Sequence, residues 1–286
     1  MSAVRPTAPA RASISVRGVT KRFEIPREPS FLALQEANLE VSPGEFLALV
    51  GPSGCGKSTL LRLMSGLIPP SEGEIWVGDT RVEGPQADFS TVFQSPRLLP
   101  WKTVEENVAL PLRLGRRRAT PAKREVRDRV AELLDLVQLS AFARRYPGEL
   151  SGGMQQRVSI ARSLVTSASI LLMDEPFGAL DAFTREYLNE ELLSIWKATG
   201  RTIVFVTHDM DEAVFLADRV AVMGAQPGRI IDVLDIDLPR ERDGGIRTEA
   251  AFFDSVRRVR KAMGSTGRRA DPEPAPAAES TEGVHA

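Results

Sequence analysis

A glycine-rich stretch has the residue types and the spacing needed to hold phosphate groups. Its residues are Gly51, Pro52, Ser53, Gly54, Cys55, Gly56, Lys57, Ser58 and Thr59. Glycines let the backbone fold around an anion with its N–H groups pointing inward, and a following helix adds the positive end of its dipole. Lys57 is then expected to reach the β- and γ-phosphates of a nucleotide, and the Ser58 hydroxyl to bind Mg²⁺. A chance glycine-rich turn is the alternative, but the complete motif between a strand and a helix argues against it.

Two adjacent carboxylates follow a nearly pure apolar run, Ile170–Met173. Such a run is typical of a buried parallel strand, whose carboxyl end delivers side chains to the edge where these sheets bind ligands. Asp174 is therefore predicted to contact Mg²⁺ through water. Glu175 is predicted to be the general base that polarises the attacking water molecule. The alternative is a solvated strand end with no chemical role.

His208 could join this chemistry, and the other histidine, His285, lies in the C-terminal tail. His208 follows a second apolar run, Thr202–Val206, and precedes a segment, Asp209–Glu212, that is typical of a capped helix start. A lone histidine of this kind would more often be structural or on the surface. At the end of a strand beside the Asp174 strand, however, it could contact the γ-phosphate.

The surrounding elements predict an α/β core. Short strand-like runs separated by turn residues come first, and a helix is expected from Lys57 to about Gly66. From about Val104 to Leu164 the apolar spacing becomes helical, for example over Lys123–Gln138. Apolar runs typical of parallel strands follow. This order favours an α/β core with an antiparallel β portion and an inserted helical subdomain. The four early runs are Ala12–Val16, Leu32–Val41, Glu45–Val50 and Glu74–Val77.

Composition excludes several classes of protein. Of the 286 residues, 42% are hydrophobic and 26% are charged, which is typical of a globular protein with a real core. A formal net charge of −1 provides no basic field for nucleic acid. The single cysteine, Cys55, fits a reducing compartment, and we interpret it as a small tolerated residue of the loop rather than a redox sensor. With no secretory signal in Met1–Arg11 and no membrane-spanning run, we expect a soluble, intracellular protein.

The segment Leu150-Ser-Gly-Gly-Met-Gln-Gln-Arg157 carries a resemblance to a known family. With Gln94, Gly178-Ala-Leu-Asp181 and His208, it makes the chain similar to the ATP-binding cassette (ABC) ATPases over about residues 14–260. The resemblance implies an α/β P-loop NTPase core with a mainly parallel sheet, an antiparallel β subdomain and an inserted α-helical signature subdomain. We expect an ATPase domain at residues 13–263, with the helical subdomain at about 95–165, between disordered segments 1–12 and 264–286.

The signature segment explains why such a protein would work as a pair. Ser151, Gly152 and Gly153 at a helix N-terminus form a second anion site in the same chain. The resemblance implies a head-to-tail homodimer in which ATP lies between one subunit's loop at 51–59 and the partner's segment from Ser151 to Gln155. It also places Asp181 near the seam. Gln94 would touch Mg²⁺ or the attacking water and report site occupancy to the membrane partner.

Two details of the resemblance are specific to this chain. Phe23 stands where the family commonly stacks a tyrosine on adenine. Phenylalanine lacks the tyrosine hydroxyl but keeps the aromatic ring face, so stacking is still expected. A β-strand core aromatic is the alternative for Phe23, and Phe31 is a competitor for the adenine. Gly178 stands where serine is more usual, which removes one hydroxyl contact and leaves the expected fold unchanged.

The residues after Gln94, with Glu175–Thr184, look like the nitrate/sulfonate/taurine-type importer ATPases of bacteria. This likeness implies ATP hydrolysis coupled to uptake of a small solute, at the cytoplasmic face of the membrane. The implied partners are a separate integral-membrane permease and, indirectly, an extracytoplasmic solute-binding protein. Leu98, Leu99 and Trp101 suggest a groove for a permease helix, with ordinary subdomain packing as the alternative.

Two other functions fit less well. A soluble ABC ATPase acting on DNA or ribosomes would carry a long coiled-coil insertion or a second cassette, whereas Gln94 and Ser151 are only 57 positions apart. A P-loop kinase would leave Ser151 and His208 without a role. The transported solute stays open, because specificity is set by the permease and the binding protein. Small organic or inorganic anions are favoured by the resemblance, and pyrimidine vitamin precursors are the alternative.

Overall fold

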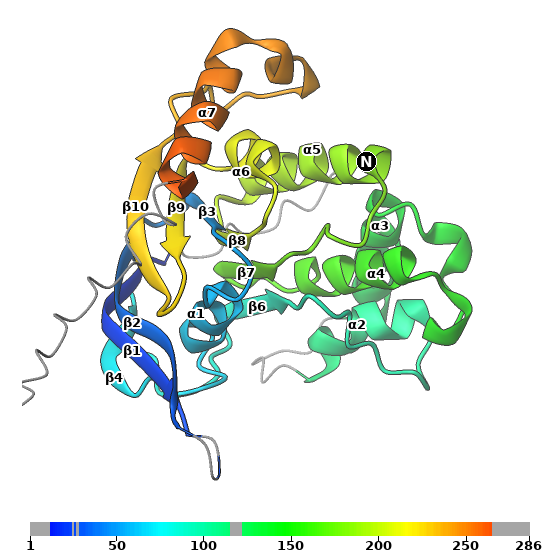
Figure 1. Ribbon diagram of the computed structural model, residues 1–286. Helices are drawn as coiled ribbons and strands as arrows, with labels where there is room; N and C mark the ends of the chain where they lie inside the picture. The colour runs from blue at the N-terminus through cyan, green and yellow to red at the C-terminus, as the bar shows by residue number, and fades with distance from the viewer. Residues whose placement is uncertain (1–11, 25, 27–28, 115–121, 265–286) are drawn as a thin grey trace, which may run out of the picture.

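The computed structural model describes residues 12–24, 26, 29–114 and 122–264 (Figure 1). The predicted disordered ends therefore lie outside the described residues, apart from Ala12 and Gly264. The strands are β1 Ile14–Phe23, β2 Phe31–Val41, β3 Phe46–Val50, β4 Glu72–Val77, β5 Thr80–Arg81, β6 Phe89–Val92, β7 Ile170–Asp174, β8 Thr202–Val206, β9 Arg219–Gly224 and β10 Arg229–Asp235. The α-helices are α1 Lys57–Met64, α2 Val104–Leu114, α3 Lys123–Leu136, α4 Gly152–Leu164, α5 Ala182–Thr199, α6 Met210–Leu216 and α7 Ala250–Gly264. Short 3-10 helices occupy Ser140–Phe142, Pro147–Glu149 and Gly244–Thr248.

A six-stranded sheet in the order β10-β9-β3-β8-β7-β6 forms the centre of the molecule. Its strands β9, β3, β8, β7 and β6 pair in parallel, and β10 adds an antiparallel edge. The predicted neighbourhood of the two apolar runs is confirmed, because β7 pairs directly with β8 and Asp174 lies opposite Val206. The loops after β3, β7 and β8 therefore emerge at one edge of the sheet, as in other parallel sheets that bind ligands.

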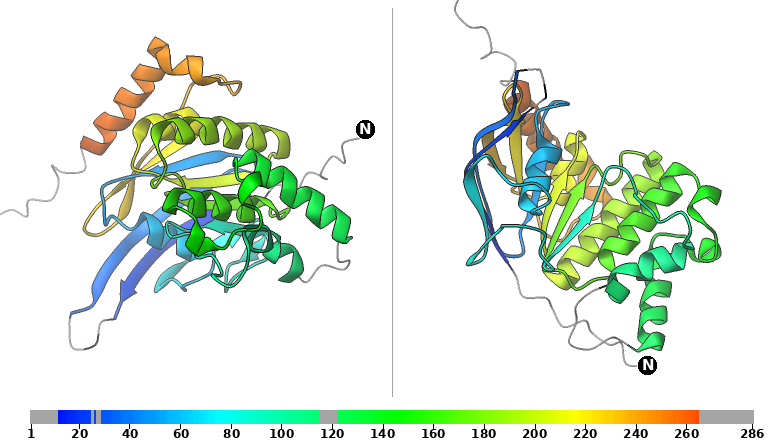
Figure 2. Two further views of the ribbon diagram at one scale, coloured as in Figure 1. Left: turned by 90° about the vertical axis from the view of Figure 1, so that its right-hand side faces the viewer. Right: turned by 90° about the horizontal axis from the view of Figure 1, so that it is seen from below.

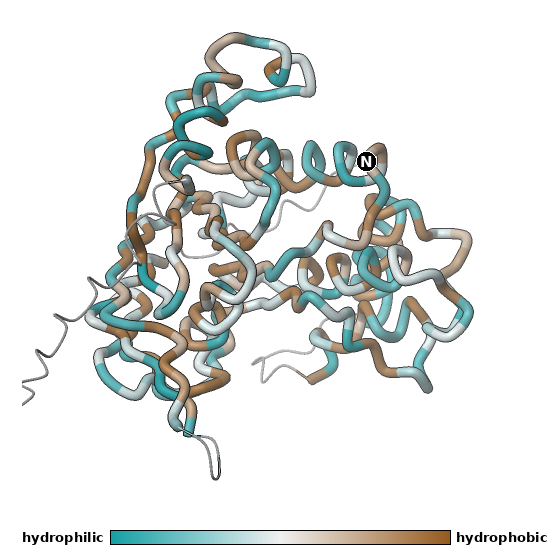
Figure 3. Tube along the Cα trace, in the orientation of Figure 1, coloured by the Kyte–Doolittle hydropathy of each residue, from teal (hydrophilic) through white to brown (hydrophobic). Residues whose placement is uncertain are grey.

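Side chains that point alternately to the two faces of the central sheet contribute to two hydrophobic cores, one on each face. Phe46 and Ala48 of β3 face a core shared with α4, α5, α6 and α7, whereas Leu47 and Leu49 face α1 and the second sheet. Successive side chains of a strand point to opposite faces, so a strand buried on both sides is apolar at nearly every position. All five residues of β3, β7 and β8 are buried accordingly. Figure 3 shows that the covering helices α4 and α5 alternate between apolar and polar residues.

A second, four-stranded sheet in the order β2-β1-β4-β5 is antiparallel. The predicted strand Ala12–Val16 is too short, because β1 continues to Phe23. The continuation passes through Gly18, whose φ of 57° and the neighbouring register shifts interrupt the apolar alternation. A bulged strand keeps its pairing while losing the sequence pattern of a regular one.

Helices α2 and α3 lie with α4 at the side of the central sheet where β6 is the edge strand, as the two views of Figure 2 show. Helix α2 packs on both α3 and α4. The predicted fold class, a mainly parallel core with an antiparallel β subdomain and an inserted helical subdomain, is confirmed. Within the described ranges, every helix is too short or too polar to cross a membrane.

Candidate active site

The glycine-rich loop joins β3 to α1 and turns back on itself through two left-handed residues. Gly54 and Gly56 have φ values of 77° and 94°, which side chains other than glycine rarely adopt. Gly56 is also the N-terminal cap of α1, and it offers no side chain to the helix's first N–H groups. The Lys57 Nζ lies 2.8 Å from the Gly51 carbonyl oxygen and 3.0 Å from that of Pro52. The loop thus places a lysine ammonium beside the start of α1, where the first N–H groups of a helix have no partner within the helix, as phosphate binding requires.

The loop is held tightly by neighbouring strands. A side chain on Gly228, at the turn before β10, would place its Cβ 2.1 Å from the Cys55 carbonyl oxygen. One on Gly56 would place its Cβ 2.8 Å from the Leu34 side chain of β2. Cys55 itself is fully buried, and burial raises the pKa of its thiol. This contact shell fixes the loop's shape and makes Cys55 a packed residue rather than an accessible thiol.

Ser58 and Asp174 meet at the base of the loop. The Ser58 hydroxyl donates to Asp174 Oδ1 at 2.9 Å. Asp174 ends β7 at 4% exposure, and burial raises the pKa of its carboxyl group although the Ser58 hydrogen bond lowers it. No cluster of three histidine, cysteine or acidic ligands exists in the described ranges. Mg²⁺ fits this pair nonetheless, because it prefers hard oxygen donors and is usually held by one or two protein groups together with substrate phosphates and water.

Glu175 is the point on which the predicted catalytic residues converge. Its Oε2 lies 3.4 Å from Gln94 Nε2 and 3.5 Å from His208 Nδ1. The Glu175 backbone has a φ of 45°, which is strained for a residue with a side chain, and its N–H donates to the Val206 carbonyl oxygen of β8. The residues that follow β6 and β8, Gln94 and His208, therefore meet at one carboxylate oxygen of Glu175, which follows β7.

A buried polar cluster lies behind His208, and sequence reasoning missed most of it. The Thr207 hydroxyl donates to Glu212 Oε2 and accepts from the Asp209 N–H. Burial raises the pKa of Glu212 to about 7. The Asp209–Glu212 pattern predicts only the helix cap, which Asp209 indeed makes with the N–H groups of Asp211 and Glu212. The burial of Glu212 comes from the packing of α6 between α5 and β3, which no local pattern shows.

The signature segment begins α4, as its pattern predicts. Ser151 is the N-terminal cap, and its hydroxyl accepts from the Met154 N–H at 3.3 Å. A Cβ on Gly152 would meet nothing within 4 Å in the described chain, whereas one on Gly153 would lie 3.3 Å from the Ala179 carbonyl oxygen. The Gln155 side chain turns back and donates to the carbonyl oxygens of Pro147 and Leu150. The helix start is therefore open to an approaching group on its Gly152 side.

Asp181 caps α5 next to this segment. Its carboxylate accepts from the Thr184 N–H at 3.0 Å, and this hydrogen bond lowers the pKa of Asp181. Arg157 of α4 is close enough to lower that pKa further. The signature helix and the Gly178–Asp181 turn thus form one continuous surface.

The segment after Gln94 is fixed by residues without a sequence signal. Gln156 of α4 is buried and donates to the Phe93 carbonyl oxygen at 3.2 Å. Arg162 of the same helix donates to the carbonyl oxygens of Pro96 and Arg97. These bonds attach the signature helix to the strand that carries Gln94.

Phe23 and Phe31 lie directly opposite each other where β1 and β2 pair. They are 36% and 53% exposed, so neither is a core aromatic, and both rings are available for stacking. The Lys21 ammonium lies 5.2 Å from the centre of the Phe23 ring. Strand β2 then runs past the phosphate loop at Leu34, which connects this aromatic pair to the loop.

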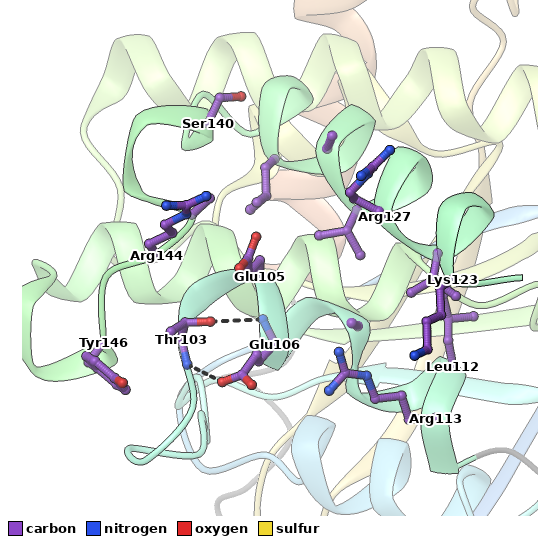
Figure 4. Close-up of a pocket in the computed structure, with 16 residues that line it drawn as sticks. Thr103, Glu105, Glu106, Leu112, Arg113, Lys123, Arg127, Ser140, Arg144 and Tyr146 are labelled. Atoms are coloured by element: carbon purple, nitrogen blue, oxygen red, sulfur yellow. Dashed lines mark hydrogen bonds between the residues drawn. The ribbon is translucent and has the colours of Figure 1, made fainter.

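A cavity of about 880 Å³ lies between α2 and α3 (Figure 4). Its floor is apolar, and its rim carries both acidic and basic side chains. The segment predicted as a groove does not line it: Leu98 packs on the main core, and Trp101 is 70% exposed. The cavity starts two residues later, at Thr103. Its charged rim consists of Glu105, Glu106, Arg113, Lys123, Arg127 and Arg144.

A phosphate loop after β3, a carboxylate pair at the end of β7 and a histidine after β8, the strand between them, define a nucleoside triphosphatase. Residues 34–178 match the family model described as "ABC transporter". The chain is 43% identical over 247 residues to an aliphatic sulfonates import ATP-binding protein of Bacillus cereus, covering 86% of this chain and 94% of that one. It is 47% identical to the protein of the same name from Bacillus licheniformis, covering 82% and 88%.

Solved structures agree with this assignment. A bacterial ABC transporter cassette determined as a dimer matches with a TM-score of 0.73 and 35% identity, over 79% of this chain and all of that one. A dimeric post-hydrolysis state of an ATP-binding cassette with ADP and Pi matches with a TM-score of 0.72 and 34% identity, over the same shares. The chain belongs to the ABC transporter family and is an ATP-binding, ATP-hydrolysing cassette of that family.

Proposed function

We propose that this chain is the ATPase subunit of an importer, working as a head-to-tail homodimer on a separate membrane permease. The ATPase domain comprises residues 13–263. The observation that carries this proposal is the division of the nucleotide machinery within one chain. The loop at 51–59 and Glu175 form one half, and the open helix start at Ser151 and Gly152 forms the other.

Each residue of the first half has a defined task. Lys57 and the loop N–H groups bind the phosphates, and Phe23 or Phe31 stacks on the adenine. Ser58 and Asp174 would hold Mg²⁺ directly or through water, and Gln94 lies close enough to contribute. The ion neutralises charge on the phosphate oxygens when bound. Glu175 accepts a hydrogen bond from the attacking water and polarises it, while His208 supplies a contact to the γ-phosphate.

The second half acts on the partner's nucleotide. In the described ranges, no hydrogen bond or ion pair joins residues 51–59 to residues 151–155. An anion at the Ser151 helix start of one subunit is therefore best supplied by an ATP held on the other, as a head-to-tail pair provides. The Gly152 position favours this, because its missing side chain leaves room for a group from outside the subunit. Asp181, on the same surface, would lie at the seam.

The cavity between α2 and α3 is the proposed seat of a permease helix. Its apolar floor fits one face of an amphipathic helix, and its rim has four basic and two acidic side chains, which favours an occupant with acidic residues. The position is suited to coupling, because the adjoining segment leads back to Gln94. Asn107 of α2 bonds to both the N–H and the carbonyl oxygen of Leu99, so movement of α2 moves that segment.

The solute class follows from the relatives. The two relatives described above are named as aliphatic sulfonates import ATP-binding proteins, and we infer a small organic or inorganic anion for this chain. A solute-binding protein outside the membrane would deliver it. The ATPase would lie at the cytoplasmic face, attached through the permease and independent of nucleic acid.

Reconstitution tests this proposal. The chain is co-expressed with the permease encoded nearest to its gene, placed in liposomes, and supplied with ATP on the cassette side and the matching binding protein on the other. An alkanesulfonate, taurine, nitrate and a pyrimidine are compared as solutes. We expect one of the three anions to stimulate hydrolysis and to accumulate, with no accumulation in the Glu175→Gln variant. Stimulation by the pyrimidine alone would contradict the solute class. A hydrolysis rate that stays the same with and without the permease and the binding protein would contradict the proposed importer function.

A further inference from the structure

Arg185 connects the two loops that border the hydrolysis site. It lies in the first turn of α5, and its Nη2 donates at 3.0 Å to the carbonyl oxygen of Leu180, next to Asp181. Its Nη1 lies 3.6 Å from Oδ2 of Asp209, the residue after His208. One guanidinium thus spans the distance between the turn that faces the proposed partner and the loop that carries the histidine.

The Asp209 end of this connection is held by several bonds directly next to His208. Asp209 uses Oδ1 to accept from the N–H groups at the start of α6, and its own N–H donates to the Thr207 hydroxyl. Its second carboxylate oxygen is therefore left for Arg185. Because Asp209 is bonded on three sides, a displacement of Arg185 moves the backbone on which His208 stands. His208 Nδ1 in turn lies 3.5 Å from Glu175 Oε2.

The cluster around Arg185 is able to rearrange. Within the described part of the chain, Arg185 Nε is buried without a hydrogen-bond partner. A polar cluster with unmade bonds has less to lose on changing its pairing than a fully bonded one. The Arg185–Asp209 pair is also partly accessible, with side-chain exposures of 30% and 35%. The Arg185–Asp209 ion pair can therefore shift when the turn that ends at Asp181 shifts.

We propose that Arg185 is a positioning residue that couples the Asp181 turn to the His208 loop. Docking of a second subunit against the Asp181 turn would then place His208 against Glu175 and the γ-phosphate. Hydrolysis at one site becomes dependent on closure of the dimer. This inference rests on the proposed head-to-tail dimer.

A double-mutant cycle tests the coupling. Arg185→Gln removes the charge, and Asp209→Asn removes the ion pair while keeping a good helix cap. Turnover is measured against ATP concentration for wild type, both single variants, the double variant and Arg185→Lys. We expect each single change to lower kcat roughly 3- to 10-fold and the double change to lower it no further, since both remove one interaction. KM for ATP should stay constant, the Hill coefficient should fall towards one, and Arg185→Lys should recover part of the rate.

Independent losses in the two single variants that add in the double would overturn the inference, as would an unchanged Hill coefficient with a raised KM. If Arg185→Gln fails to fold, Asp209→Asn and Arg185→Lys carry the same comparison with smaller changes. Glu175→Gln is measured alongside. Wild-type turnover by Glu175→Gln would remove the proposed catalytic role itself. An inactive Glu175→Gln with a fully active and cooperative Arg185→Gln would remove only the coupling.

Discussion

Glu212 should make the stability of this protein depend on pH near neutrality. Glu212 is 5% exposed on α6, and the Thr207 hydroxyl donates to its Oε2. Burial disfavours the charged carboxylate and raises the pKa of Glu212 from 4.5 to about 7. Replacing Glu212 by glutamine keeps the shape and removes the titration.

The magnitude follows from the size of this shift. A pKa raised by about 2.5 units corresponds to about 3 kcal/mol of free energy between the folded and unfolded states. Because the folded pKa is the higher one, the stabilisation is fully present below the unfolded pKa of 4.5 and is lost as the pH rises through about 7. On going from pH 5 to pH 8.5, wild type should therefore lose about 2.5 kcal/mol relative to Glu212→Gln, because the unfolded state is already largely ionised at pH 5.

Urea unfolding at fixed ionic strength measures this difference. Wild type, Glu212→Gln and Glu83→Gln are compared at pH 5, 7 and 8.5. Glu83 is an exposed glutamate, so its variant removes a carboxylate without changing a buried site and should follow wild type at each pH. Parallel curves for wild type and Glu212→Gln across this range would refute the reasoning, because they would show that Glu212 has the same pKa in the folded and unfolded states.

Two further changes test how the phosphate loop and α6 are held. Gly228→Ala would push its Cβ against the Cys55 carbonyl oxygen, and we expect ATP affinity to fall roughly tenfold in a fluorescence titration. Gly148→Ala, where a Cβ meets nothing within 4 Å, should bind ATP normally. Arg242→Met removes a buried guanidinium that donates to three carbonyl oxygens at the end of α6, which should cost about 3 kcal/mol of unfolding free energy. Arg257→Met, at an 80% exposed side chain, should melt like wild type.

Local sequence signals were sufficient wherever the chemistry is carried by consecutive residues. The loop at 51–59 and the strand ends at Asp174 and His208 have patterns that specify both the element and its place on a parallel sheet. The adjacency of β7 and β8 could be predicted because both strands are mainly apolar, as is typical of strands buried on two faces in the middle of a parallel sheet. The roles of these residues remain predictions until the variants are measured.

Other features depend on contacts that are distant in the sequence. The predicted strand ends at Val16 and not at Phe23, because the bulge at Gly18 interrupts the apolar alternation in the rest of β1. Gln156 and Arg162 bond to backbone carbonyl oxygens about 65 positions away, and such acceptors leave no trace in residue type. The cavity beyond Trp101 requires the packing of α3 on α2, which helical periodicity alone does not specify.

The composite ATP site, shared between two subunits, is tested most directly by mixing two inactive variants. Lys57→Ala removes the phosphate-binding ammonium, and Ser151→Arg fills the helix start that should face the partner's ATP. Neither homodimer should hydrolyse ATP, whereas a mixture should recover turnover, because each heterodimer keeps one site built from an intact loop and an intact helix start. Full activity of Ser151→Arg alone, or a mixture as inactive as its components, would contradict a site shared between two subunits.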